Sequence, residues 1–223
     1  MTAVEYHPGA SVPADADPRI VDFSAADLRA RLDDALGVYV AAMDYPPGTA
    51  RHRAPTWTEH TSRPGWRSVA ALLPDADDRL DARAAPIVAI AYGYRGAPHQ
   101  WWHQQVHNGM RRTGWSARET HELLGNYFEV TELHVHPHWQ GRGLGERLLS
   151  RLLTGRPERA ALLSTPEIAD EGNRAWRLYR RFGFTDVIRR FTFAGDRRPF
   201  AILRCPLPPT HPGLWNPPRR IPR

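Results

Sequence analysis

The sequence predicts a mixed fold of the α/β (α+β) class, with helices on both faces of one central sheet. Two apolar runs at 66–73 and 86–94 are separated by a proline and an acidic turn, which is the pattern of a β-hairpin. In the second half, strand-like and helix-like segments alternate, which favours helices packed on a sheet. With 223 residues the chain is long enough to bury a substantial core.

The composition is that of a globular protein and excludes several classes. Hydrophobic residues make up 41% and charged residues 24% of the chain. No apolar run approaches the roughly eighteen residues that could cross a bilayer, and the N-terminus has no signal-peptide pattern. We therefore expect a cytoplasmic location and no membrane partner. The single cysteine, Cys205, allows neither an internal disulfide nor a cysteine-based zinc cluster.

Every one of the 30 basic residues is an arginine, and the net charge is +6. The absence of lysine excludes a Schiff-base lysine mechanism. Arginine binds phosphate through a planar fork. The excess of positive charge therefore fits a nucleic acid, a phosphorylated cofactor or a solvated surface.

The chain is expected to hold a flexible leader at 1–18, a single domain at 19–205 and an irregular tail rich in proline and arginine at 206–223. Within the domain, 96–126 is unusual because it carries three tryptophans and four histidines. We interpret this segment as an insertion that forms one or two short helices.

Local signals place the remaining elements. Ser24 is a good N-cap for a helix that ends near Met43, with apolar residues at helical spacing. The stretch that follows, as far as Gly65, has no clear period. The second half is expected to contain a strand at 127–135, a glycine loop at 140–145 and a helix to about 153, a strand at 160–164, a helix at 174–182, and strands near 184–193 and 200–205.

The loop Gln140-Gly141-Arg142-Gly143-Leu144-Gly145 links a strand to a helix. Glycine allows a tight turn and a close approach of the backbone to a ligand. The following helix offers unpaired N–H groups and a positive dipole end, which suit a phosphate, and Arg142 could add a charge-assisted bond. The glycine spacing is neither the dinucleotide fingerprint nor a P-loop, since no lysine follows.

Two motifs together carry a resemblance to a known family. The loop is similar to the signature Q/R-x-x-G-x-G/A, and 178–184 is similar to L-Y-x-x-x-G-F. On these motifs the chain is identified as a member of the GCN5-related N-acetyltransferase (GNAT) family. The resemblance is strong over 128–205 and loose over 19–95. It implies a mixed, mostly antiparallel sheet with a splayed strand pair that holds acyl-CoA, and acetyl-CoA as co-substrate without a metal.

The same resemblance implies roles for particular residues. Tyr179 matches the general acid that protonates the departing thiolate, although it could also be a structural tyrosine. The backbone N–H of Val135 is expected to stabilise the oxyanion. Gly172 stands where the family often has asparagine, and Asn173 could cap the helix, contact the cofactor, or do both. The residues expected to bind the cofactor are Leu133, His134, Val135, Gln140, Gly141, Arg142, Gly143, Leu144, Gly145, Glu146, Asn173 and Tyr179.

The general base is left open among three residues and water. Glu129 lies eleven residues before Gln140, where some family members keep a catalytic glutamate, and is the first choice. Glu132 and His134 lie on the same strand, and an imidazole changes its charge near neutrality. Ordered water without a dedicated base is the remaining option.

The resemblance implies an N-acetyltransferase in which an amine attacks acetyl-CoA directly within a ternary complex. The acceptor remains open among a small molecule, a peptide or protein, and an aminoacyl-tRNA. The alternative is an RNA-binding module or a regulatory coenzyme A-binding module without turnover. The RNA-binding reading is supported by the arginine excess and by a few aromatic and tail residues, namely Trp101, Trp102, Trp115, Arg219, Arg220 and Arg223.

Two further hypotheses concern single segments. His134, His136 and His138 alternate as metal ligands on a strand would, but Pro137 interrupts the strand, and solvated or substrate-facing histidines are favoured. The segment 96–126 is expected to help form the acceptor pocket. A structural flap or a homodimer contact is the alternative role for it.

Overall fold

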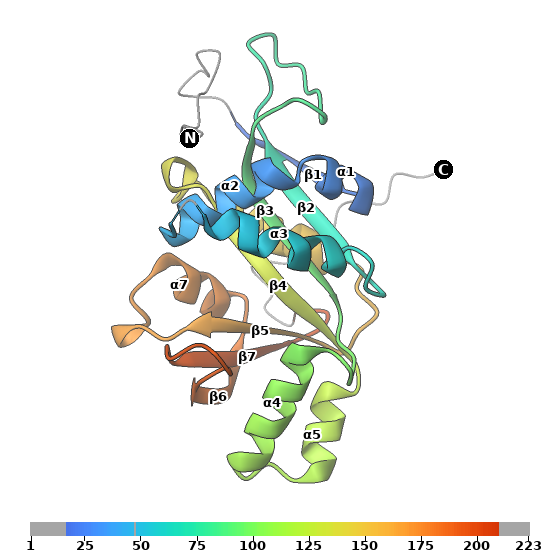
Figure 1. Cartoon of the computed structure of the whole chain (residues 1–223), viewed down its shortest axis with the longest axis vertical. Helices are drawn as coiled ribbons and strands as arrows, with labels where there is room; N and C mark the ends of the chain where they lie inside the picture. The colour runs from blue at the N-terminus through green and yellow to red at the C-terminus, as the bar shows by residue number, and fades with distance from the viewer. Residues whose placement is uncertain (1–16, 47, 210–223) are drawn as a thin grey trace. The chain divides into compact units, whose positions relative to one another are not determined.

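The computed structural model describes residues 17–46 and 48–209, and the chain divides into two compact units (Figure 1). Unit 1 comprises the chain up to Gly93 and Glu132–Leu152, and unit 2 comprises Tyr94–Thr131 and the chain from Leu153. Most of the expected leader (1–16) and most of the expected tail (210–223) lie outside the described residues.

Seven strands form one mixed sheet in the order β1-β2-β3-β4-β5-β7-β6. The strands β4 and β5 pair in parallel, whereas the pairs β1–β2, β2–β3, β5–β7 and β6–β7 are antiparallel. The predicted fold class is therefore confirmed. The strands are β1 (Arg19–Phe23), β2 (Arg67–Leu72), β3 (Ile87–Arg95), β4 (Tyr127–Val135), β5 (Ala160–Pro166), β6 (Thr185–Phe191) and β7 (Phe200–Pro206).

The helices fall close to the predicted positions in the second half and less so in the first. They are α1 (Ala25–Ala30), α2 (Leu32–Met43), α3 (Thr49–His60), α4 (Trp101–Arg112), α5 (Ala117–Leu124), α6 (Leu144–Leu153) and α7 (Arg174–Arg181), with short 3-10 turns at Pro137–Trp139 and Ala169–Glu171. None of the helices in the described part of the chain is long and apolar enough to cross a membrane.

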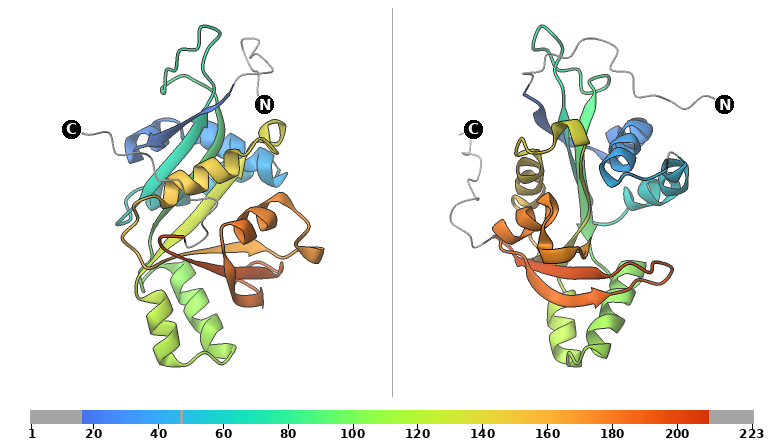
Figure 2. Two further views of the ribbon diagram at one scale, coloured as in Figure 1. Left: turned by 180° about the vertical axis from the view of Figure 1, so that it is seen from behind. Right: turned by 90° about the vertical axis from the view of Figure 1, so that its left-hand side faces the viewer.

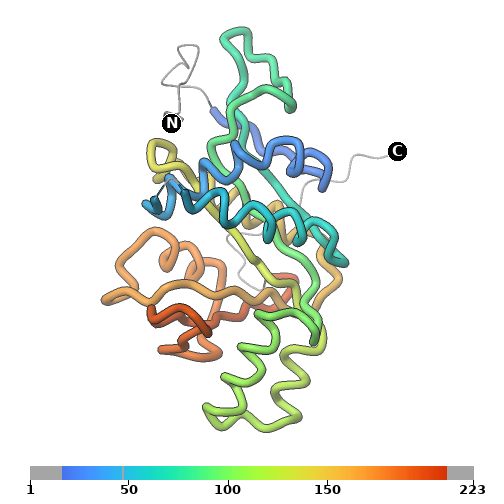
Figure 3. The backbone as a smooth tube through the Cα atoms, in the orientation of Figure 1, coloured from blue at the N-terminus to red at the C-terminus, as the bar shows by residue number. Residues whose placement is uncertain are grey.

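In unit 1, the predicted helix from Ser24 to Met43 forms as two helices. Ser24 makes a capping box with Asp27, as expected, but the backbone leaves the helical region at Arg31. Both side-chain Nη atoms of Arg31 donate to the carbonyls of Ala82 and Ala85, at 3.0 and 2.9 Å, in the loop between β2 and β3. The break between α1 and α2 therefore allows the Arg31 side chain to hydrogen-bond to the loop between β2 and β3, which Figure 3 traces.

The helix α3 was not predicted, and strand β1 was not predicted either. Pro55 lies inside α3, and a proline usually ends a helical pattern because it lacks the N–H and clashes with the preceding turn. The helix persists because Trp57 and His60 are buried on one side of it, so tertiary packing outweighs propensity.

Both faces of the unit 1 strands are covered. Figure 2 shows α2 and α3 on one face of β1–β3 and α6 on the other. The helix α6 is fastened to β1 because Arg151 Nε donates to Asp22 at 3.0 Å. Its leucines Leu148, Leu149 and Leu152 are fully buried. This packing fixes the direction in which the N-terminus of α6 points within unit 1.

Unit 2 repeats this layered arrangement with its own core. Figure 2 shows α7 on one face of β5–β7 and the α4–α5 hairpin on the other. Both α4 and α5 lie within the segment 96–126, so the prediction of one or two short helices there is confirmed. The core beneath the hairpin consists of Trp102, Val106, Met110, Leu123, Leu124, Tyr127, Ala160, Leu162, Ile188, Phe191, Phe193 and Ile202.

Candidate active site

The end of β4 in unit 1 carries a buried, partnered carboxylate and imidazole. Glu132 and His134 are 8% and 9% exposed. Their side chains lie on the same face of the strand, because alternate residues share a face. The Nε2 atom of His134 lies 2.6 Å from one oxygen of Glu132. The other carboxylate oxygen accepts from Nη2 of Arg53, on α3, at 2.7 Å.

These contacts determine the protonation of the pair. Burial opposes ionisation of Glu132, but the hydrogen bond with His134 and the contact with Arg53 hold the pKa of Glu132 below its ordinary value. An ionised carboxylate can only accept hydrogen bonds, so Nε2 of His134 must carry a proton. In the neutral imidazole, Nδ1 then keeps its lone pair. The contact with Glu132 can therefore orient the His134 ring so that Nδ1 accepts a proton.

An aromatic wall surrounds the pair. The ring of Tyr39 meets that of His134 edge-on at 4.9 Å, and Trp57 packs against Tyr39 at 5.7 Å. The Nε atom of Arg53 and the Nε1 atom of Trp57 are buried and have no hydrogen-bond partner within the described residues. A buried donor without a partner costs about 1–3 kcal/mol, so these two N–H groups mark a place where an acceptor oxygen would be stabilised.

Arg53 is a site residue that the sequence analysis missed. Arg53, Trp57 and His60 stand at i, i+4 and i+7 of α3 and share one helix face. That spacing is visible in the sequence. The stripe was not recognised because its members are polar or aromatic rather than aliphatic and because Pro55 lies between them.

The predicted glycine turn also lies in unit 1, between β4 and α6. Gly141 and Gly143 adopt φ values of 82° and 76°, a region that favours glycine. A side chain built on Gly143 would meet no atom within 4 Å, so the space beside this residue is open. The side-chain nitrogen of Gln140 donates to the carbonyl of Val135 at 3.1 Å, which folds the turn back onto the end of β4.

The other residues predicted around the turn are placed as follows. The guanidinium of Arg142 lies 4.5 Å from the centre of the Trp139 ring. Leu144 is buried at the start of α6, and Glu146 lies in its first turn. Leu133 and Val135 are the neighbours of His134 on β4, on the opposite face of the strand.

The three alternating histidines do not converge. His136 and His138 pack edge-on at 5.1 Å, whereas His134 turns to Glu132. Among residues 17–46 and 48–209, no group of three histidine, cysteine, aspartate or glutamate side chains could hold a metal ion.

The remaining predicted residues lie in unit 2. Glu129 is buried and accepts from the hydroxyl of Tyr94 at 3.1 Å. Asn173 caps α7, since its side-chain oxygen accepts from the backbone N–H of Trp176 at 2.9 Å. Tyr179 is 7% exposed and its ring meets Phe184 edge-on at 5.7 Å. The capping role of Asn173 is therefore confirmed, and a packing role of Tyr179 is present.

Comparison with known proteins gives consistent results. The family described as "Acetyltransferase (GNAT) domain" matches residues 98–186, a range that includes most of the 96–126 segment. The GCN5-like protein acetyltransferase Rv2170 of Mycobacterium tuberculosis is 52% identical over 201 residues, which cover 85% of this chain and 98% of that protein.

Solved structures show the same fold at low identity. Arabidopsis thaliana NAA60 in complex with acetyl-CoA has a TM-score of 0.54 and 16% identity, over 85% of this chain and 98% of the other. The putative acetyltransferase yncA from Salmonella typhimurium with its cofactor acetyl-CoA has a TM-score of 0.50 and 15% identity, over 86% and 97%.

The fold and the two motifs thus define an acetyltransferase, a transferase of class EC 2.3.1. The identity of 52% over most of both chains makes the assignment specific: the chain belongs to the GCN5-related N-acetyltransferase family.

Proposed function

We propose that this chain transfers the acetyl group of acetyl-CoA to an amine carried by a protein, by direct attack within a ternary complex. The observation that carries the proposal is the junction at the end of β4, where a partnered Glu132–His134 pair is followed by an open glycine turn. A protein acceptor is favoured because the relative at 52% identity is named a protein acetyltransferase, and acetyl-CoA because two structures of the same fold contain it.

The glycine turn would bind the pyrophosphate of coenzyme A. Gly143 leaves room beside the backbone, and the N-terminus of α6 contributes N–H groups and a positive dipole. Val135 N–H would donate to the oxyanion, and Arg142 would bind a phosphate oxygen. The expected splayed strand pair and the expected cofactor contacts of Leu133, Gln140, Glu146 and Asn173 belong to this proposal.

The Glu132–His134 pair would accept the proton of the attacking amine. Glu132 orients the imidazole through Nε2, so Nδ1 can take the proton while the amine nitrogen forms its bond to the thioester carbon. Arg53 would keep Glu132 ionised and, through Nε, bind a carbonyl oxygen of the acceptor. Collapse of the tetrahedral intermediate breaks the carbon–sulfur bond, and Tyr179 would give the thiolate its proton.

The test combines calorimetry with product analysis. We expect acetyl-CoA to bind with micromolar affinity and Gly143→Glu to abolish binding, because a carboxylate would then face the phosphates. The chain has no lysine, so any acetyl-lysine found after incubation with a protein extract belongs to the acceptor. Equal affinity of the unsubstituted chain and Gly143→Glu for acetyl-CoA would disprove the cofactor site.

Two other outcomes separate parts of the proposal. Binding of acetyl-CoA without any acetylated product, from proteins, small amines or aminoacyl-tRNA, would favour the regulatory alternative. In an active preparation, Tyr179→Phe should slow turnover about 10²–10⁴-fold with cofactor affinity unchanged. A change of less than about threefold would leave Tyr179 with only its packing role against Phe184.

A further inference from the structure

A concave site lies in unit 2, at the amino-terminal ends of β4 and β5. It is a pocket of about 290 Å³, near the lower end of the range of small-molecule sites. Leu123, from α5, and Ala160, from β5, are buried apolar residues in its lining. The lining is completed by Trp115, Glu119, Glu122, Asn126, Arg159 and Arg204.

Both arginines of this pocket lack partners within the described residues, whereas Arg118, Arg156 and Arg180 of the same unit form ion pairs. Arg159 directly precedes β5, and Arg204 is paired in register with Leu162 on β5. Both side chains are exposed. Neither guanidinium makes a hydrogen bond or an ion pair with any residue between 17 and 209 that the structure describes. Two unpaired guanidinium groups in one pocket favour an anion, since arginine recognises carboxylate and phosphate with paired N–H bonds.

The acidic residues of the pocket are already engaged. The Glu119 carboxylate closes the capping box of α5, where it accepts from the backbone N–H of Ser116 at 2.8 Å. Glu122 forms an ion pair with Arg118 at 2.8 Å. Neither carboxylate forms an ion pair with Arg159 or Arg204, so the N–H groups of both guanidinium groups stay available to a ligand.

The indole of Trp115 supplies a flat wall. It is half-buried, and it packs against the same core cluster to which Leu123 and Ala160 belong. An aromatic ring beside an apolar floor stacks well with a planar ligand. The Trp115 backbone is fixed, because its N–H donates to the carbonyl of Met110 at 3.0 Å and its carbonyl accepts from Arg111.

We propose that this pocket binds a small organic anion with a flat ring, with the anionic group on Arg159 and Arg204 and the ring on Trp115. The anionic group is a phosphate or a carboxylate. None of the residues that line this pocket is among those proposed to bind acetyl-CoA.

The experiment is calorimetry on the full chain with three probes, in the presence of saturating coenzyme A so that a phosphate site at the glycine turn is filled. Uridine monophosphate carries a ring, a ribose and a phosphate, orotate carries a ring and a carboxylate, and uridine carries the ring and the ribose without an anionic group. We expect at least one of the two anions to bind about tenfold or more tightly than uridine, and their order identifies the preferred anion.

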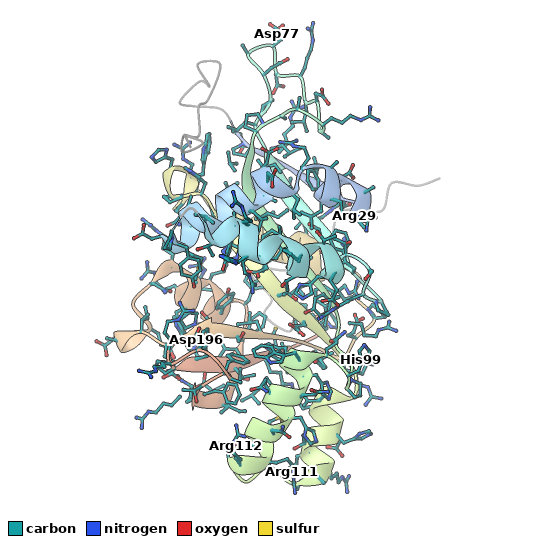
Figure 4. All side chains as sticks on the ribbon, viewed as in Figure 1. Arg29, Asp77, His99, Arg111, Arg112 and Asp196 are labelled. Carbon is teal, nitrogen blue, oxygen red and sulfur yellow. The ribbon has the colours of Figure 1, made fainter. Side chains whose placement is uncertain are left out.

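The variants locate the site. Arg159→Gln and Arg204→Gln should each weaken the preferred anion about tenfold. Trp115→Leu should weaken it about fivefold or more, with a thermal melt to check folding. Arg112→Gln is the matched control, because this exposed arginine at the end of α4 (Figure 4) does not line the pocket. Equal binding of uridine and the anions, no binding at millimolar concentration, or unchanged affinity in both arginine variants would overturn the proposal.

Discussion

Both units bury a carboxylate that accepts on both oxygens, but its partners differ between the units. In unit 1, Glu132 is buried and satisfied on both oxygens by Arg53 and His134. In unit 2, the buried Glu158 accepts from Arg95 and Arg156 and from no imidazole. At the surface of this unit, Arg180 and Arg189 share Glu171 and Asp186. A buried ion pair must be fully hydrogen-bonded to be tolerated, whereas exposed pairs contribute little each.

This difference indicates where chemistry and where binding should be sought. The buried pair of unit 1 holds an imidazole in one tautomer, which suits proton transfer. In the described part of unit 2, Arg159 and Arg204 form no ion pair, which suits the recognition of anions.

The largest effect is expected from His134→Ala and Glu132→Gln in an acetylation assay at saturating substrates. Loss of a general base typically lowers the rate about 10²–10⁴-fold. The matched control is Glu129→Gln, since this carboxylate lies on the opposite face of β4 by strand alternation and accepts from the neutral Tyr94 hydroxyl. If Glu129→Gln lowers the rate more than His134→Ala and Glu132→Gln do, the general base lies in unit 2 and not in unit 1.

The second effect concerns the adjacent tryptophans of α4. Trp102 is 7% exposed and donates to the Ser164 hydroxyl at 3.2 Å, whereas Trp101 is 52% exposed and stacks on Phe193 at 5.3 Å. Trp102→Ala should cost about 3–5 kcal/mol of unfolding free energy. Trp101→Ala should cost about 1 kcal/mol or less. Urea unfolding measures both.

The two tryptophan variants also test whether the two units open separately. If each unit opens cooperatively, Trp102→Ala should speed amide hydrogen exchange in β5–β7 and leave β1–β3 unchanged. Uniform acceleration in both units would mean that the chain unfolds as one body.

Unchanged acceptor Michaelis constants in both tryptophan variants would exclude the hypothesis that 96–126 forms the acceptor pocket.

Sequence reasoning performed best where local signals and tertiary packing agree. The strand β4 and the helix α7 were predicted within one residue because glycine, caps and apolar periodicity coincide there. It failed at α3, where Pro55 contradicts the helical stripe of Arg53, Trp57 and His60.

The site was predictable in its motifs but not in its pairings. The glycine turn follows from the need for positive φ at Gly141 and Gly143. The partnership of Glu132 with Arg53 joins residues far apart in the chain, so no spacing rule reveals it. For the same reason, Arg159 and Arg204 gave no signal in the sequence.

The smallest effect tests the buried character of unit 1 through His60. Burial first, and the charge of Arg63 second, lower the pKa of His60 to about 4 from 6.5. Between pH 6.5 and 4, His60 is protonated in the unfolded chain but not in the folded chain. The free energy of unfolding should therefore decrease as the pH drops from 6.5 to 4, by about 3 kcal/mol in total. Urea unfolding across this range should show a shallower loss for His60→Gln than for the unsubstituted chain. His107→Gln, at an exposed position of α4, should leave the slope unchanged. If His60→Gln loses stability with falling pH as steeply as the unsubstituted chain, His60 is hydrated in the folded state. The surroundings of Tyr92, whose hydroxyl lies 3.0 Å from Nδ1 of His60, would then be more open than the packing implies.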